Sequence, residues 1–97
     1  MDAKLTWKSG MAFNAVANSN IEVPLDASVD HGGGGAGVVP MEMILMGLGG
    51  CTAMDVISIL AKKRQEVTSF EILLHADRAA EHPKVFTDIT IEYVVKG

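Results

Sequence analysis

Residues 38–64 read VVPMEMILMGLGGCTAMDVISILAKKR, and this stretch decides the fold. Pro40 fits the first turn of a helix, where its missing N–H is not needed. Apolar side chains then recur on every face up to about residue 65, and Glu42 and Asp55 are the only charges before the basic run at the end. Because a helix that is apolar all round is normally buried, the sequence predicts a long buried central helix over residues 40–65.

Segments with the alternating pattern of β-strands flank this helix. Residues 1–24 contain three short ones, the last of them stopped by Pro24, and predict a three-strand antiparallel meander. Residues 67–97 contain two longer ones joined by a polar link, and predict a β-hairpin. The expected architecture is therefore one α+β domain over residues 1–97, in the order β-β-β-α-β-β, with a five-stranded antiparallel sheet on one side of the helix.

This arrangement leaves one side of the helix uncovered. Nothing else in the 97 residues can cover the side that faces away from the sheet. We therefore expect further elements after Gly97, a second subunit, or both. A domain this short buries only a modest fraction of its surface, so a partner would also add stability.

A glycine-rich loop over residues 25–39 joins the meander to the helix. It contains the run Gly32-Gly33-Gly34-Gly35, which indicates little local stiffness and a mobile loop over a site. A phosphate-binding loop is not expected, because the Gly-Lys-Ser/Thr sequence that closes such loops is missing.

The composition excludes several classes of function. The hydrophobic share of 48% and the net charge of -4 are typical of a soluble globular protein without a basic stripe for nucleic acid. A membrane span is not expected, because Glu42 and Asp55 would lie within the hydrocarbon region. One cysteine and no signal peptide predict a cytoplasmic protein. The three histidines have no ligand spacing, so neither a metal nor a cofactor is expected; they are His31, His75 and His82.

Cys51 is the candidate reactive residue. It lies well inside the predicted helix, away from the helix N-terminus that could stabilise a thiolate, and Asp55 at i+4 opposes one. Three glycines stand beside it, and each costs a helix interior about 1 kcal/mol relative to alanine; they are Gly47, Gly49 and Gly50. Such glycines favour close backbone approach or space at a ligand site. The expected pocket around Cys51 consists of these glycines with Met54 and Asp55.

Glu42 is a weaker candidate. Nine residues separate it from Cys51, which is two and a half turns at about 3.6 residues per turn, so the two side chains lie on opposite faces of a straight helix. Its simpler role is that of a favourable carboxylate in the first helical turn.

The helix sequence, from Pro-Met-Glu to Gly-Gly-Cys-Thr-Ala-Met-Asp, resembles the central-helix signature of the OsmC/Ohr family, in its YhfA-type branch. Residues 81–86, EHPKVF, and the strand after them match that branch as well, so the resemblance covers nearly the whole chain. It implies an intertwined homodimer with long helices buried at its centre. It also implies reduction of organic hydroperoxides by a peroxidatic cysteine, here Cys51, with a resolving cysteine and a dithiol reductant such as dihydrolipoamide.

The sequence departs from the hydroperoxide-reducing members of that family at three points. The segment that carries their resolving cysteine is missing from these 97 residues, so we expect the chain to be truncated. No arginine precedes the helix, and Lys4 and Lys8 are the only cations there. Met41 follows the proline where those members have glutamate, and Glu42 comes one residue later, about 100° further round the helix.

Three hypotheses remain open at this point. The first is a thiol peroxidase that acts on organic hydroperoxides through Cys51. The second is a non-enzymatic dimer that holds a small hydrophobic ligand, which the missing arginine and the six methionines favour. In the third, Cys51 only packs, as free cysteines commonly do.

Overall fold

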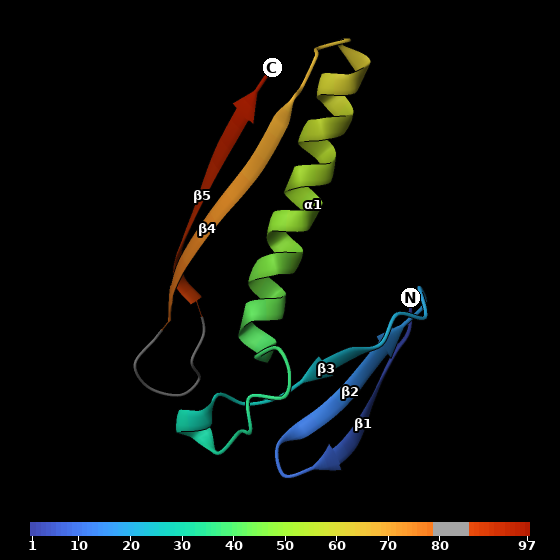
Figure 1. Ribbon diagram of the computed structural model, residues 1–97, viewed down its shortest axis with the longest axis vertical. Helices are drawn as coiled ribbons and strands as arrows, with labels where there is room; N and C mark the ends of the chain where they lie inside the picture. The colour runs from blue at the N-terminus through green and yellow to red at the C-terminus, as the bar shows by residue number, and fades with distance from the viewer. Residues whose placement is uncertain (79–85) are drawn as a thin grey trace. The chain divides into compact units, whose positions relative to one another are not determined.

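The computed structural model contains five strands and one long helix among the residues that it describes, 1–78 and 86–97. The chain divides into two compact units, Met1–Ile44 and Leu45–Gly97, and each is described by itself. The elements follow the predicted α+β order (Figure 1): β1 (Ala3–Ser9), β2 (Ala12–Ala17), β3 (Val23–Leu25), the 3-10 helix η1 (Val29–His31), α1 (Pro40–Lys62), β4 (Ser69–Arg78) and β5 (Phe86–Lys96). The single-domain expectation stays a prediction.

The first unit contains an antiparallel sheet in the order β1-β2-β3. Leu5 pairs with Ala15, and Trp7 pairs with Phe13. Directly paired residues point to the same side of a sheet, so one face is apolar throughout. It consists of Ala3, Leu5, Trp7, Phe13, Ala15, Ala17, Val23 and Leu25.

The third strand differs from the prediction. It was expected to stop before Pro24, but β3 runs through this residue, which pairs with Asn14. An edge strand tolerates a proline because no N–H is needed on its free side. On that outer side the Val38 N–H donates to the Pro24 carbonyl at 2.9 Å, a bond that needs no N–H from Pro24.

The predicted five-stranded sheet is wrong, because β1–β3 and β4–β5 form two separate sheets. The outer edge of β3 carries a proline and already contacts the segment at Val38 through a parallel bridge from Leu25. A further strand therefore finds no free ladder of donors and acceptors on that edge.

Backbone hydrogen bonds join the two ends of the glycine-rich segment, and its expected mobility stays a prediction. Its ends meet where the Asp26 N–H donates to the Val38 carbonyl at 3.1 Å, as in a compact Ω-loop. Within it, Gly32 has a φ of 86°, in the left-handed region. A side chain at Gly33 would overlap the Ala27 carbonyl. Individual glycines are therefore required by the backbone path.

Both ends of α1 are capped. At the start, the Val39 N–H donates to Glu42 Oε1 at 3.1 Å, the carboxylate half of a capping box. At the end, the Arg64 N–H donates to the Ala61 carbonyl and the Gln65 N–H to the Leu60 carbonyl, both at 3.0 Å. This is a Schellman motif, with Arg64 in the left-handed region at φ 55°. The helix therefore ends at residue 62, before the predicted 65.

In the second unit, α1 lies alongside the hairpin of β4 and β5 (Figure 1). Most of the hairpin's apolar side chains share one face, through pairs such as Ile72 with Tyr93 and Leu74 with Ile91. Gly49 is the one buried residue of the helix among the described residues. An added Cβ there would lie 2.6 Å from Leu74 Cδ1, so this glycine sets the close approach of helix and hairpin.

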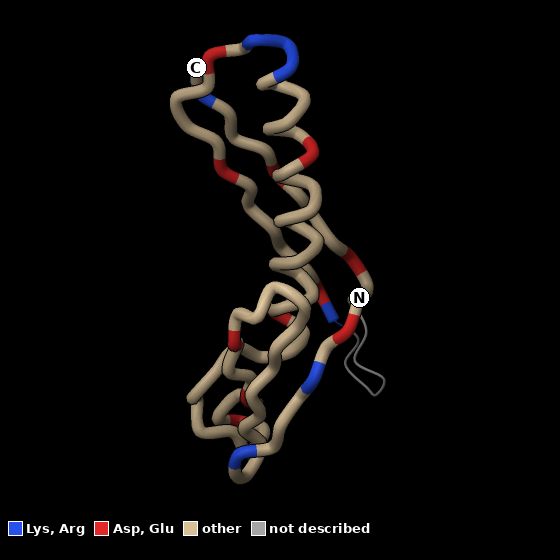
Figure 2. Tube along the Cα trace, turned by 90° about the vertical axis from the view of Figure 1, so that its right-hand side faces the viewer, with Lys and Arg blue, Asp and Glu red and all other residues tan. Residues whose placement is uncertain are grey.

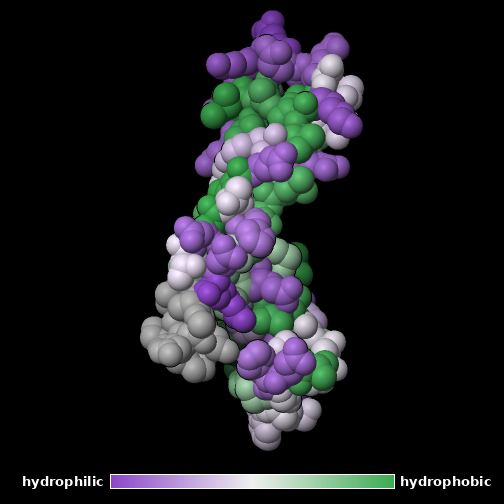
Figure 3. Space-filling model, turned by 90° about the vertical axis from the view of Figure 1, so that its left-hand side faces the viewer, coloured by the Kyte–Doolittle hydropathy of each residue, from purple (hydrophilic) through white to green (hydrophobic). Residues whose placement is uncertain are grey.

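Apolar surface remains exposed on both units. Among the described residues no hydrophobic side chain is fully buried, and Trp7 and Met54 are 63% and 71% exposed. Figure 3 shows hydrophobic residues in green at the surface, between hydrophilic ones in purple. The helix is thus present as predicted, and burial of its outer side stays a prediction that depends on a second subunit.

By length and composition α1 could cross a membrane, a test that core helices of soluble proteins also pass.

The basic residues of the described chain do not form a stripe of the kind that binds nucleic acid. Figure 2 shows one continuous run of basic residues in blue, at the end of α1, and scattered acidic ones in red. The run is Lys62-Lys63-Arg64, where cations interact favourably with the carbonyl end of the helix.

Candidate functional site

Cys51 lies on the outer side of α1 and its thiol is exposed. Gly49, two residues earlier, faces the hairpin, and a step of two residues is about 200° round a helix. The hairpin therefore does not cover the sulfur. Along residues 1–78 and 86–97 no hydrogen bond or ion pair of Cys51 is found.

The three glycines beside Cys51 have two different roles. Gly49 permits the contact with Leu74. Gly47 and Gly50 have no heavy atom within 4 Å of an added Cβ. Gly47 is four residues before Cys51 and therefore its neighbour on the helix surface. The two outer glycines leave open space beside the thiol, and the third holds the helix against the hairpin.

Met54 and Asp55 complete the outer side of this helical segment. They are three and four residues after Cys51, the spacing of neighbours on one helix face. Both are exposed. Thr52 is half-buried, and its hydroxyl donates to the Leu48 carbonyl at 3.0 Å. Helical spacing thus places Gly47, Met54 and Asp55 beside Cys51, and a pocket formed by these residues stays a prediction.

Glu42 caps the start of α1, and a role for it beside Cys51 stays a prediction. It lies in the first unit, exposed, and its carboxylate accepts the Val39 N–H. Its structural role is to cap the helix, which agrees with its expected place in the first turn. The spacing of a glutamate three residues after Val39 is the sequence signal of such a cap.

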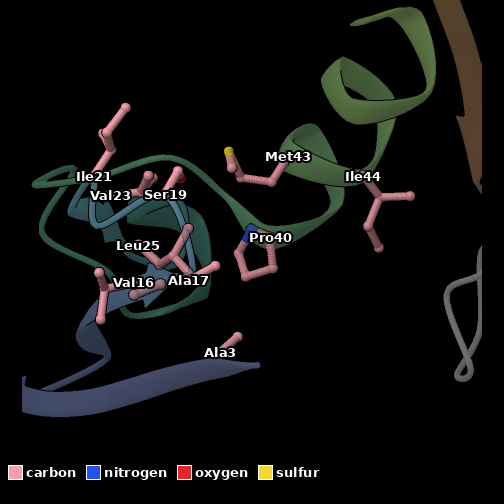
Figure 4. A pocket seen from close by; sticks show the side chains of 11 residues that line it. Ala3, Val16, Ala17, Ser19, Ile21, Val23, Leu25, Pro40, Met43 and Ile44 are labelled. Atoms are coloured by element: carbon pink, nitrogen blue, oxygen red, sulfur yellow. The ribbon is translucent and has the colours of Figure 1, made fainter. Parts of the chain in front are cut away.

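A larger cavity lies in the first unit, with a volume of about 490 Å³. Strand side chains, Pro40 and the first helical residues form its wall, and Met43 extends from the helix beside Pro40 (Figure 4). Every lining side chain is apolar except Ser19. A cavity of this size and composition fits a small apolar molecule.

Asp26 ties the glycine-rich loop together, a structural role that the sequence analysis missed. It is 4% exposed, the one buried charged residue among those described. Its Oδ1 accepts the Ala27 N–H at 2.7 Å, and its Oδ2 accepts the N–H groups of Gly34 and Ala36, each at 3.1 Å. The Ala36 donor, with the other two, holds the pKa of the Asp26 carboxyl below its usual value, although burial acts in the opposite direction. An aspartate between a strand and a glycine run is a turn signal that could have predicted this role.

The two described histidines form hydrogen bonds with residues other than Cys51. His31 Nδ1 is 2.8 Å from Ser28 Oγ, and His75 Nε2 is 3.2 Å from Asp77 Oδ1 at the surface. His82 and most of the sequence EHPKVF lie outside the described residues. Within the described part of the chain no group of three His, Cys, Asp or Glu side chains could hold a metal ion.

Two comparisons with known proteins indicate the same family relationship for this chain. Residues 32–97 match the family described as OsmC-like protein. Over its full length the chain is 38% identical to Protein YhfA of Escherichia coli (strain K12), and it spans 69% of that protein.

Solved structures share the fold. A hypothetical protein from Aquifex aeolicus VF5 is 34% identical, with a TM-score of 0.82 over 97% of this chain and 64% of its own. A protein from Psychrobacter arcticus 273-4, named for osmotic stress induction and a detoxification response, is 20% identical, with a TM-score of 0.85 over 98% of this chain and 69% of its own. With the family match over residues 32–97 and the identity to YhfA, these results establish that the chain belongs to the OsmC-like protein family.

Proposed function

We propose that this protein reduces organic hydroperoxides through Cys51, as part of the defence against oxidative stress. The observation that carries the proposal is the exposed thiol on the outer side of α1, with open space at Gly47 and Gly50 beside it. A peroxide must bring its O–O bond in line with the sulfur, so a nucleophilic thiol needs an open approach.

The reaction that we propose has two stages. The Cys51 thiolate attacks one peroxide oxygen, an S–O bond forms, the O–O bond breaks, and the alcohol leaves with a proton. Cys51 is then a sulfenic acid. A dithiol reductant attacks it with release of water, and its second thiol displaces Cys51 as the dithiol closes to a disulfide.

A homodimer forms part of the proposal. Large apolar side chains are exposed on both units, and contiguous apolar surface of this kind normally marks an interaction site. A second copy would cover the outer side of α1 and could bring a cation to Cys51. Lys4 and Lys8 are the cations before the helix, and a nearby positive charge is what stabilises a thiolate.

The proposed location is the cytoplasm, with neither membrane nor nucleic acid as a partner. The net charge of -4 argues against binding to nucleic acid. The carboxylates of Glu42 and Asp55 argue against insertion into a membrane.

Reaction of the thiol with cumene hydroperoxide tests the proposal. The protein and free cysteine are mixed with the peroxide at pH 7, and the sulfenic acid is trapped with dimedone and located by mass spectrometry. We expect Cys51 to react at least about 100-fold faster than free cysteine, which corresponds to two tenfold steps in rate. Equal rates would contradict the proposal.

Two variants refine this test. Cys51→Ser should abolish the dimedone adduct without a change in dimer formation. Met54→Leu keeps the apolar volume beside the thiol and should retain the reaction. If Cys51→Ala instead lowers stability alone, by about 1 kcal/mol, and no peroxide reaction is present in the parent protein, Cys51 only packs.

The second candidate function is a dimer that holds a small hydrophobic ligand. The apolar cavity of about 490 Å³ in the first unit favours it. In that case a fluorescent fatty-acid analogue should bind with unchanged affinity to Cys51→Ser, and Ile21→Glu, at the cavity wall, should abolish binding. The absence of any uptake would rule this function out.

A further inference from the structure

Ser28 and His31 form a pair of polar side chains in the glycine-rich loop of the first unit, to which Cys51 does not belong. The Oγ atom of Ser28 lies 2.8 Å from Nδ1 of His31. A hydroxyl and a basic nitrogen about 2.6–3.2 Å apart are the arrangement with which proteins activate a nucleophilic serine. Neither residue has a part in the functions proposed above.

The backbone of η1 brings these two side chains together. The His31 N–H donates to the Ser28 carbonyl at 2.9 Å, and in a 3-10 turn of this kind side chains three residues apart lie one above the other. The Ser28 carbonyl also accepts the Gly33 N–H at 2.9 Å. Directly before this turn, the Ala27 N–H donates to Asp26 Oδ1. The contact between hydroxyl and imidazole therefore follows from backbone hydrogen bonds on both sides of Ser28.

The hydroxyl of Ser28 does not serve as a helix cap. A serine that precedes a helix normally accepts an N–H group of the first turn through its side chain, but Ser28 makes no such bond to η1. In the tautomer that carries its proton on Nε2, His31 can accept the hydroxyl proton at Nδ1. This hydrogen bond leaves the lone pairs of the serine oxygen available for attack, and it places a general base at the proton that must be removed.

The surroundings of the pair suit a small neutral reactant. His31 is exposed and Ser28 is half-buried. At Gly32, directly after the histidine, an added Cβ would meet no heavy atom of the described residues within 4 Å. The exposed carboxylate of Asp30 lies in the same turn and would repel an anion. The open side and this charge together favour an uncharged molecule.

We propose that Ser28 takes an acyl group from small neutral activated esters, with His31 as its general base. The Oγ atom attacks the carbonyl carbon and its proton passes to His31 Nδ1, so that a C–O bond forms to the serine. The bond to the leaving alcohol then breaks, and the imidazole returns the proton to the leaving oxygen. Water hydrolyses the acyl-serine with the same base. The reaction needs neither an oxidant nor a reductant, and it is independent of the proposed chemistry at Cys51.

Acetylation by p-nitrophenyl acetate tests the proposal. The full chain is used as the Cys51→Ser variant, because a free thiol would also take the acetyl group. Absorbance follows the release of p-nitrophenol at pH 8, and mass spectrometry of peptides locates the acetylated residue. General-base assistance is worth about 10²–10⁴-fold, so Ser28 should be acetylated at least about 100-fold faster than Ser9, an exposed serine of β1. Equal acetylation of the two serines would overturn the proposal.

Two histidine variants separate activation of Ser28 from catalysis by any surface imidazole. His31→Gln keeps a polar group beside the hydroxyl and the backbone bonds of the turn but has no base, so acetylation of Ser28 should fall at least about 100-fold. His75→Gln is the matched control, because His75 is also exposed and its Nε2 contacts a carboxylate, that of Asp77; it should acetylate Ser28 at the parent rate. Circular dichroism checks that both variants fold. An equal loss in the two variants would contradict the assignment, as would an undiminished release of p-nitrophenol by Ser28→Ala.

Discussion

Gly49 provides the sharpest test of how α1 packs on the hairpin. We expect Gly49→Ala to destabilise the protein, although alanine is the better helix former by about 1 kcal/mol. The added Cβ would lie 2.6 Å from Leu74 Cδ1 and 3.2 Å from Leu74 Cδ2, both closer than carbon atoms pack. Overpacking of this kind typically costs about 1–3 kcal/mol. The net expectation is a loss of up to about 2 kcal/mol, the difference between these two terms.

Gly47→Ala is the matched control. The same change of residue meets no heavy atom within 4 Å at that position, so the variant should gain up to about 1 kcal/mol from helix propensity. Urea denaturation followed by circular dichroism measures both. Two protein concentrations are needed, because a second chain against the outer side of α1 would affect Gly47→Ala alone.

A double-mutant cycle isolates the contact with Leu74. In a Leu74→Ala background the side chain that obstructs the new methyl group is gone, so Gly49→Ala should become stabilising by about 1 kcal/mol. If Gly49→Ala matches Gly47→Ala in the parent protein and shows no coupling to Leu74→Ala, the close approach that we infer does not exist.

Three further predictions concern the loop and the two ends of the helix. Folding lowers the pKa of Asp26, so the ionised carboxylate stabilises the folded protein. This stabilisation is complete above the unfolded-state pKa near 4 and is lost as the pH falls through the folded-state pKa. Denaturation between pH 2 and 7 should show this loss in the parent protein and not in Asp26→Asn. Glu42→Ala should cost about 1 kcal/mol because the Val39 N–H loses its acceptor, whereas Glu42→Gln, which can still cap, should retain thermal stability and peroxide reactivity. Arg64→Gly should raise the melting temperature, since glycine adopts a positive φ without the roughly 1 kcal/mol that other residues pay, and Lys63→Gly, inside the last turn, should lower it.

The sequence alone predicted the five strands and the long helix, together with their order along the chain. A period of two and an unbroken apolar run are local patterns, and they placed all five strands and α1 to within a few residues. The ends were less well predicted. Arg64 ends the helix in a left-handed conformation that its sequence does not favour, and Pro24 lies within β3 because this strand is at the edge of its sheet.

The sequence also indicated that one side of the helix lacks a cover within these 97 residues, and the exposure of Met54 and Cys51 in the single chain agrees with that inference. The sequence predicted the roles of individual polar residues less accurately. Glu42 was weighed as a partner of the thiol and is a helix cap, because a carboxylate in the first turn finds the free N–H of Val39 before it reaches any other group.

The outer face that carries Cys51 and the glycines beside it was already defined by the sequence, because helical spacing alone decides which residues are neighbours on one helix. Only the tertiary structure distinguished Gly49 from Gly47 and Gly50, since the three differ in what lies opposite them and not in their own chemistry. It also decided the state of Asp26, whose carboxylate is closed in by N–H groups eight and ten residues further along the chain. Contacts between residues distant in sequence depend on how the whole chain closes, and no local pattern contains that information.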